Sequence, residues 1–158
     1  MFNVKVVRRE HHNIWRRVFA HSFRGTHVKV GFPAGQAGAD TIQKAIWNEF
    51  GTRGGASGGG WGGPIPERPF LRNAMRANQN KYREGLRHGA VEILRQGTSI
   101  PTILARLGAL AQGDIQSEIT SLSSPPNSPV TIKLKGSSNP LIDSGEMRQR
   151  VTWKVDNA

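Results

Sequence analysis

The longest stretch of helical periodicity in the chain covers residues 69–96. Pro69 suits the first turn of a helix, and Gly97 follows the last residue as a stop signal. Gly85 and Gly89 thin the apolar face at places where another backbone can pack closely. The pattern predicts one long helix whose apolar stripe is formed by Leu71, Met75, Tyr82, Leu86 and Ile93.

A second long helix is predicted to begin near Ser99 and to end at the Ser-Ser-Pro-Pro run at 123–126. Pro101 lies in its first turn, where a missing backbone N–H costs nothing, and Gly108 and Gly113 weaken its middle. The side chains expected to face inward are Ile103, Leu104, Leu107, Leu110, Ala111, Ile115 and Ile119.

Two shorter helices are predicted nearer the N-terminus. Residues 41–50 have Asp40 as a candidate N-cap and Gly51 as a C-terminal stop. Their core-facing positions are predicted to be Ile42, Ala45, Ile46 and Phe50. Residues 11–22 carry a second apolar stripe made of Ile14, Trp15, Val18 and Phe19.

Four short segments alternate apolar and polar residues, as half-buried strands do. Their apolar positions are Phe2/Val4/Val6, Val28/Val30/Phe32, Val130/Ile132/Leu134 and Val151/Trp153/Val155. Because successive strand side chains point to opposite faces, one open face of a shared sheet would carry Lys5, Lys29, Lys133, Lys135 and Lys154. Such a face is either a functional basic surface or a solubilising, edge-protecting one.

These elements predict an α+β fold with a small, mainly antiparallel sheet of about four strands packed against three to four helices. The chain has 158 residues and a mass of 17.3 kDa, so residues 1–158 are expected to form a single domain. A long glycine-rich loop at residues 52–63 interrupts the pattern, and its only aromatic residue is Trp61. Because glycine loses the most backbone entropy when it is fixed, this loop is expected to be a flexible arm.

The charge of the chain indicates an acidic partner. There are 22 Lys and Arg against 11 Asp and Glu, which gives a formal net charge of +11. The partner could be nucleic acid or the acidic face of another protein. Binding to DNA would be sequence-independent and through the backbone, because few exposed aromatic rings are available for stacking on bases.

The long predicted helix adds a second basic feature. Arg72, Arg76, Arg83 and Arg87 fall on one strip beside its apolar stripe, although charged residues are also common on any solvated helix face.

The sequence contains no convincing catalytic centre. It has no cysteine, which excludes disulfides, thiolate metal sites and thiol catalysis. His11 and His12 are adjacent on a predicted helix and point about 100° apart, a poor arrangement for joint chelation. The glycines at 52–63 lack the Walker and dinucleotide-binding contexts, and Asp143 with Glu146 on a turn is typical of a cap. We therefore expect a protein that is not an enzyme and that uses no cofactor, metal or small-molecule substrate.

The sequence shows no sign of membrane insertion or export. No apolar run approaches the roughly 18 residues of a membrane span, and the first residues do not open a secretion signal. A cytosolic product without a membrane partner is expected.

Several segments resemble the small tail-component proteins of tailed bacteriophages. They are AIWNEFGT at 45–52 and IPERPFLR at 65–72, separated by the glycine-rich loop, and then PNSPVTIKLKG at 126–136 and NPLIDSGEMR at 139–148. Together with the strand at 28–32, the resemblance spans roughly residues 27–156. Ser144 stands where Thr is more usual in that family, which keeps the small hydroxyl group.

The resemblance implies a structural virion protein of the tail-completion or neck type. Such subunits assemble as a ring, typically a hexamer, at the head–tail junction, and DNA passes through the ring. The implied partners are further copies of the chain, the connector or head-closure protein, the tail terminator or tube proteins, and genomic DNA held without sequence preference. The implied location is the neck of the virion, after assembly in the host cytoplasm.

The ring hypothesis gives roles to two groups of residues. The arm is predicted to dock on an adjacent subunit or ring through Gly54, Gly55, Gly58, Gly59, Gly60 and Trp61. A basic surface facing the lumen or a partner ring would be formed by Lys29, Lys133, Lys135, Lys154, Arg72, Arg76, Arg83 and Arg87.

Three other hypotheses remain open from the sequence. A tail terminator or minor tail subunit would occupy another position in the same particle. A basic nucleic-acid-binding module would explain the charge without any phage, and it would bind tightly as a monomer in a salt-dependent manner. A small nuclease is disfavoured because acidic metal ligands are missing.

Overall fold

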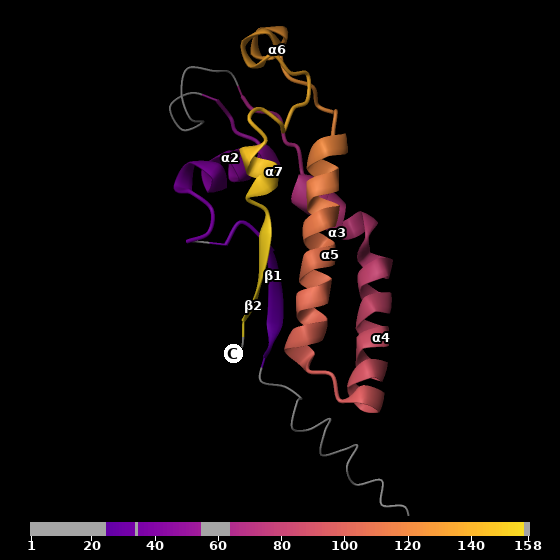
Figure 1. The fold of residues 1–158 in the computed structure, drawn as a ribbon. Helices are drawn as coiled ribbons and strands as arrows, with labels where there is room; N and C mark the ends of the chain where they lie inside the picture. Colours follow the sequence, from indigo (N-terminus) through magenta and orange to yellow (C-terminus); the bar gives the residue numbers. More distant parts are fainter. Residues whose placement is uncertain (1–24, 34, 55–63, 157–158) are drawn as a thin grey trace, which may run out of the picture.

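We describe the fold from a computed structural model, which describes residues 25–33, 35–54 and 64–156. These residues form an α+β fold of mostly helices with a small antiparallel sheet, so the predicted class is confirmed (Figure 1). The elements in chain order are β1 (His27–Gly31), α2 (Ala39–Phe50), α3 (Phe70–Ala77), α4 (Gln79–Gln96), α5 (Ile100–Ser121), α6 (Pro129–Lys135), α7 (Glu146–Gln149) and β2 (Thr152–Asp156).

The sheet joins the two ends of the described chain. β1 pairs with β2 in antiparallel register, with Val28 opposite Val155 and Val30 opposite Trp153. These apolar side chains share the face that packs on α5, because a Cβ added to Gly108 of α5 would lie 2.8 Å from Trp153 and 3.0 Å from Val28. The two predicted strands at 28–32 and 151–155 are therefore confirmed, with slightly shifted ends.

Helix α5 is the centre of the fold. It contacts both strands, α3, α4 and α7, and it lies between the sheet and α4 (Figure 1). Its start agrees with the sequence: the Ser99 side chain accepts a hydrogen bond from the Thr102 N–H, and Pro101 lies in the first turn. Of its seven predicted inward residues, Leu104 is half-buried and Leu110 is exposed, and the five buried ones are Ile103, Leu107, Ala111, Ile115 and Ile119.

The close approach predicted at Gly85 and Gly89 is present between α4 and α5. A Cβ at Gly89 would lie 2.3 Å from Ile103, and a Cβ at Gly85 would lie 2.7 Å from Leu107. The neighbour is thus a side chain of α5 rather than a backbone.

The main core lies beside the upper half of α5 in Figure 1, where α2, α3, α7 and the start of β2 come together. Phe70 is fully buried and meets Phe32 edge-on, with ring centroids 6.3 Å apart. The other fully buried large side chains are Ile115, Ile119 and Val151.

The single long helix predicted over residues 69–96 is wrong. The structure divides it into α3 and α4 at Asn78, and α4 turns away from the direction of α3 (Figure 1). The Asn78 side chain donates a 2.9 Å hydrogen bond to the Ala74 carbonyl, the same oxygen that its own N–H approaches at 3.2 Å. Asparagine favours such local side-chain bonds to the backbone and is a weak helix former, which fits a break at this residue. Gly97 ends α4 in the left-handed conformation, as the sequence predicted.

The strand predicted at Val130, Ile132 and Leu134 is also wrong, because these residues lie in α6. The Ser128 side chain caps the helix by accepting from the Thr131 N–H, Pro129 occupies the first turn, and Gly136 ends it in the left-handed conformation. These start and stop signals outweigh the alternation of the seven residues between them. The described residues therefore contain two strands of the four predicted.

Helix α2 ends where predicted, at Phe50, but begins two residues earlier than the predicted start at Thr41. Gly38, not Asp40, is the N-cap residue, and Asp40 lies in the first turn, where a carboxylate still favours the helix dipole. Of the predicted core positions only Ala45 is buried, whereas Ile46 is 50% and Phe50 is 66% exposed. Gly51 ends the helix at φ +70°, as predicted.

Two predicted elements lie outside the described residues. They are the strand at Phe2, Val4 and Val6, which includes Lys5, and the helix over residues 11–22.

Candidate functional site

The segments that carry the family resemblance meet around the buried side chain of Arg68, which is 4% exposed. Its guanidinium donates to the Pro125 carbonyl at 2.8 Å and to the Pro126 carbonyl at 3.1 Å. It also donates to the side-chain oxygens of Asn48 and Asn127, both at 3.3 Å. Arg68 thus joins α2, the segment before α3 and the segment between α5 and α6.

A second buried charge, Glu49, holds the start of α3. Its carboxylate accepts the backbone N–H groups of Leu71 at 2.9 Å and Arg72 at 3.2 Å, and the Arg72 Nε at 2.9 Å. The first N–H groups of a helix have no partner within the helix, and the helix dipole favours an anion there. Glu49 is 2% exposed, so α3 is capped by a side chain of α2.

Arg72 completes this cluster and explains why the motif at 65–72 ends in arginine. It also pairs with Glu67, and its guanidinium lies 5.2 Å from the centroid of the Phe50 ring. The hydrogen bonds that Arg72 donates to Glu49 and Glu67 raise the pKa of its guanidinium. Its charge is therefore committed to neighbours within the chain rather than left for an external partner.

The base of the glycine-rich segment is closed by reciprocal hydrogen bonds. The Thr52 N–H donates to the Ile65 carbonyl at 2.9 Å, and the Ile65 N–H donates to the Thr52 hydroxyl at 3.1 Å. Gly51 fits only without a side chain here, because an added Cβ would lie 2.9 Å from the Ile65 carbonyl oxygen. These contacts hold Thr52 and Ile65 side by side, one before and one after the glycine-rich segment.

Most of the predicted arm lies beyond the part of the chain that the structure describes. Gly54 is described and has φ +82°. The remaining predicted arm residues, Gly55, Gly58, Gly59, Gly60 and Trp61, are outside the described residues.

The predicted lysine face is not one surface. Lys29 and Lys154 are cross-strand neighbours on the outward face of the sheet. Both pair with Asp156, at 2.9 Å and 2.8 Å. Lys133 and Lys135 instead lie on α6, at the far end of the molecule (Figure 1). The lysines separate because residues 129–135 fold as a helix rather than a strand.

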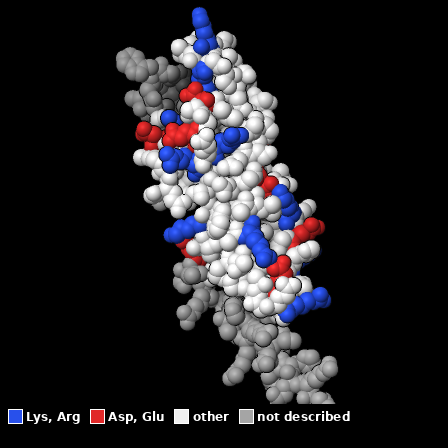
Figure 2. Space-filling view, viewed as in Figure 1, with Lys and Arg blue, Asp and Glu red and all other residues white. Residues whose placement is uncertain are grey.

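The predicted arginine strip is also divided. Arg72 belongs to α3 and is held by acidic residues, whereas Arg76 follows at the end of that helix and Arg83 and Arg87 lie beyond the break, on α4. Arg76, Arg83 and Arg87 are exposed. On the face shown in Figure 2, basic and acidic side chains alternate rather than form one positive field.

Much of the net charge lies outside these elements. Residues 1–24 contain six Lys and Arg and one Glu, so this short segment contributes almost half of the +11.

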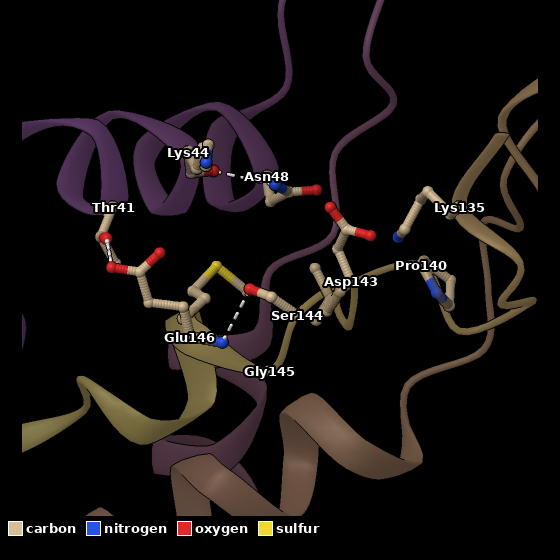
Figure 3. A pocket seen from close by; sticks show the side chains of 11 residues that line it. Thr41, Lys44, Asn48, Lys135, Pro140, Asp143, Ser144, Gly145 and Glu146 are labelled. Carbon is tan, nitrogen blue, oxygen red and sulfur yellow. Dashed lines mark hydrogen bonds between the residues drawn. The ribbon is translucent and has the colours of Figure 1, made fainter.

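A polar pocket of about 190 Å³ lies between α2 and the segment that leads into α7 (Figure 3). It is lined mainly by Thr41, Lys44, Asn48, Lys135, Asp143, Ser144 and Glu146. The Thr41 hydroxyl donates to Glu146 at 3.2 Å, and the side chains of Lys135 and Asp143 point toward one another (Figure 3). Burial lowers the pKa of Lys135, and the nearby Asp143 carboxylate opposes this shift. Because side chains of both charges line the pocket, it suits a polar group of a ligand and has no strong electrostatic potential of one sign.

The described residues contain no cluster of three or more His, Asp or Glu side chains placed to hold a metal ion. No helix among them is both long enough and apolar enough to span a membrane.

Arg68 and Arg72 belong to the motif at 65–72, but nothing in the sequence identified Glu49 or Asn127 as their hydrogen-bond partners. Glu49 lies in a helix whose apolar stripe predicted the opposite orientation, so no local signal marked it as buried. Glu49 is 22 residues from Leu71, and Asn127 is 59 residues from Arg68. Such contacts follow from packing rather than from spacing.

Comparison with known proteins gives no relative to draw on: the chain matches no protein-family model, no curated protein and no solved structure.

Proposed function

We propose that this chain is a structural subunit of the neck of a tailed bacteriophage, where copies assemble into a ring through which DNA passes. The observation that carries the proposal is that the four motif segments, at 45–52, 65–72, 126–136 and 139–148, belong to one hydrogen-bonded unit. Asn48, Arg68 and Asn127 are linked directly, and Asn127 donates in turn to the Asn139 carbonyl at 3.3 Å.

The unit around Arg68 gives a physical reason for a structural role. The charged side chain of Arg68 joins segments of the chain, and the hydrogen bonds between Thr52 and Ile65 hold together the two ends of the glycine-rich segment. A rigid base is what an arm needs if it is to reach an adjacent subunit in a defined direction. We assign the docking of this arm to Trp61 and the surrounding glycines.

Electron microscopy of the purified full-length protein tests the proposal. Rings of constant subunit number are expected, and rings or ring-bearing particles should be lost when residues 54–62 are deleted. A folded, strictly monomeric protein at all concentrations, in the presence of its neighbouring virion proteins, would contradict the ring role. Normal particles assembled from the deletion variant would contradict the role of the arm.

A contact with DNA in the channel is the second part of the proposal, and the exposed arginines favour it over the sheet lysines. Lys29 and Lys154 are paired with Asp156, whereas Arg83 and Arg87 extend from the exposed side of α4. Replacing Arg83 and Arg87 by Gln should weaken DNA binding equally for all sequences and reduce its salt dependence. The matched control replaces Lys29 and Lys154 by Gln and should change DNA binding less.

Two alternative roles can be separated by the same measurements. Tight DNA binding by the isolated monomer would favour a nucleic-acid-binding module over a ring subunit. A tail terminator or minor tail subunit would also form rings, so its distinction needs labelling of the protein within the particle.

A further inference from the structure

Helix α2 is packed with its polar side inward and its apolar side outward. Ile42, Ile46 and Phe50 follow at intervals of four residues, so they form one stripe along the helix. Ile46 is 50% exposed and Phe50 is 66% exposed, Ile42 is half-buried, and the buried residues of the helix are Thr41, Ala45 and Glu49. A helix on the surface of a monomer normally turns its apolar stripe to the core.

The orientation of α2 is fixed by specific contacts on its polar side. Glu49 accepts two backbone N–H groups of α3, Asn48 accepts from Arg68, and Thr41 donates to Glu146. Rotating the helix to bury the stripe would turn Glu49 and Asn48 toward solvent and leave the buried Arg68 and the first N–H groups of α3 without these acceptors, which is costly. Within the part of the chain that the structure describes, no segment is packed over Ile46 and Phe50.

The exposed end of the stripe is also held in place. The Arg72 guanidinium lies over the Phe50 ring at 5.2 Å, and Arg72 is itself ion-paired with Glu49. An aromatic ring that is ordered before a partner arrives loses little conformational entropy on binding.

We infer that this stripe is a contact between two copies of the chain, in which the two α2 helices pack antiparallel about a twofold axis at Ile46. Ile42 and Phe50 lie four residues on either side of Ile46, so an antiparallel pair places Ile42 of each copy against Phe50 of the other. The stripe on one copy is therefore complementary to the same stripe on the other copy.

Charge selects a second copy in this orientation. Asp40 is exposed in the first turn of α2, and Arg53 is exposed just beyond its last turn. An antiparallel pair brings Asp40 of one copy to the end that carries Arg53 of the other, twice. The two helix dipoles then also oppose, whereas a parallel pair would place like charges side by side.

The contact does not depend on the proposed phage function. A twofold contact closes on itself and gives a dimer, or it joins two rings, whereas the ring itself needs a different, head-to-tail surface.

Disulfide cross-linking tests the arrangement, because the natural chain has no cysteine. Ile46→Cys should cross-link to a second copy of itself under mild oxidation. Ile42→Cys and Phe50→Cys should cross-link to each other when mixed, and much less to themselves. Lys44→Cys is the matched control, since Lys44 is exposed on the same helix but off the stripe. Absence of these cross-links, equal cross-linking of Lys44→Cys, or self-linking at 42 and 50 would overturn the inference.

A charge exchange tests the orientation without cysteine. Asp40→Arg alone or Arg53→Asp alone should raise the dimer dissociation constant by roughly fivefold, measured by analytical ultracentrifugation. The double variant, with both changes, should restore the dissociation constant. A double variant that dimerises no better than either single variant would overturn the antiparallel arrangement.

Phe50→Glu distinguishes this contact from the ring. It should abolish dimers while far-UV circular dichroism stays unchanged, because the side chain is largely exposed. Rings seen in images of this variant would leave the proposed phage function intact, and dimers that persist would overturn only the contact inferred here.

Discussion

Arg68 is a cation that the fold buries among neutral oxygens. All the oxygens that it binds are carbonyl or amide oxygens, from Pro125, Pro126, Asn48 and Asn127. Burial lowers the pKa of this guanidinium, but arginine starts so high that it keeps its charge. The planar guanidinium is well suited to the task because it presents several donors in fixed directions.

Replacement of Arg68 should destabilise the protein strongly. We expect Arg68→Ala to lower the free energy of unfolding by about 3 kcal/mol, because hydrogen bonds from a charged group are lost within a buried site. Arg68→Lys should also be destabilising, since an ammonium group cannot make the same set of contacts. Urea unfolding measures both, and the control Arg76→Ala should stay within about 0.5 kcal/mol of wild type. A wild-type midpoint for Arg68→Ala would contradict the role given to this side chain.

Asp156 links acid stability to the end of the sheet. Hydrogen bonds from Lys154 and then Lys29 lower the pKa of this carboxyl group to about 2. A depressed pKa in the folded state stabilises the protein above the unfolded value of about 4, and this contribution is lost as pH falls toward 2. We expect Asp156→Asn to flatten part of the fall in thermal midpoint between pH 4 and pH 2. An equal effect of Asp40→Asn over this range would argue against a specific contribution of Asp156.

At the scale of elements, glycines explain why α4 and α5 pack so closely. Gly89 is buried, and Gly85 is half-buried, so side chains of α5 occupy the space where Cβ atoms of α4 would lie. In α5 itself, Gly108 admits Trp153 from the sheet, but Gly113 has nothing within 4 Å of an added Cβ. Replacing different glycines in the α4–α5 pair is therefore expected to have opposite effects on the stability of the protein.

Alanine substitution of these glycines should change stability in opposite directions. Gly89→Ala should lower the free energy of unfolding by about 1–3 kcal/mol, because its Cβ would overlap Ile103. Gly113→Ala should raise it by about 0.5–1 kcal/mol, because glycine costs helix entropy and the space is open. Thermal and urea unfolding of the two variants check this. A stabilised Gly89→Ala variant would mean that α4 and α5 are not packed this closely.

Helix α6 shows why an alternating pattern alone does not predict a strand. The alternation of Val130, Ile132 and Leu134 predicted a strand, yet Ser128 and Gly136 carried the stronger helix signals. No residue of α6 is buried, so no core selects the face that alternation implies. The alternation of apolar and polar residues correctly predicted β1 and β2, because one face of each of those strands packs against α5.

At the scale of the whole molecule, the core is concentrated where α3, α5, α7 and β2 meet, and α6 stands outside it (Figure 1). Ile115 is 1% exposed, whereas Leu134 is 83% exposed and Val130 is 68% exposed. The stability of the fold is therefore expected to depend on this core and little on the exposed side chains of α6.

Truncation of core and surface apolar residues should separate these parts. Ile115→Ala should lower the free energy of unfolding by about 2–5 kcal/mol, because it opens a cavity in the core. Leu134→Ser should change it by less than about 0.5 kcal/mol, since the side chain is already in solvent. Chemical denaturation compares the two, and a large loss of stability for Leu134→Ser would show that α6 is packed more tightly than described.

The sequence by itself determined the elements whose signals are local. The Ser99 cap and Pro101 start α5, Gly97 ends α4, and the alternation around Val28 and Trp153 marks the two strands. These signals act within a few residues, so the rest of the fold is not needed to interpret them.

Only the tertiary structure decided which way α2 faces. Its apolar stripe predicted burial, but Glu49 and Asn48 find their partners at Leu71, Arg72 and Arg68, about twenty residues away. Leaving buried polar groups unpaired costs more than exposing Ile46 and Phe50, so the polar side goes inward. That choice depends on contacts between distant segments, which no periodicity in the helix records.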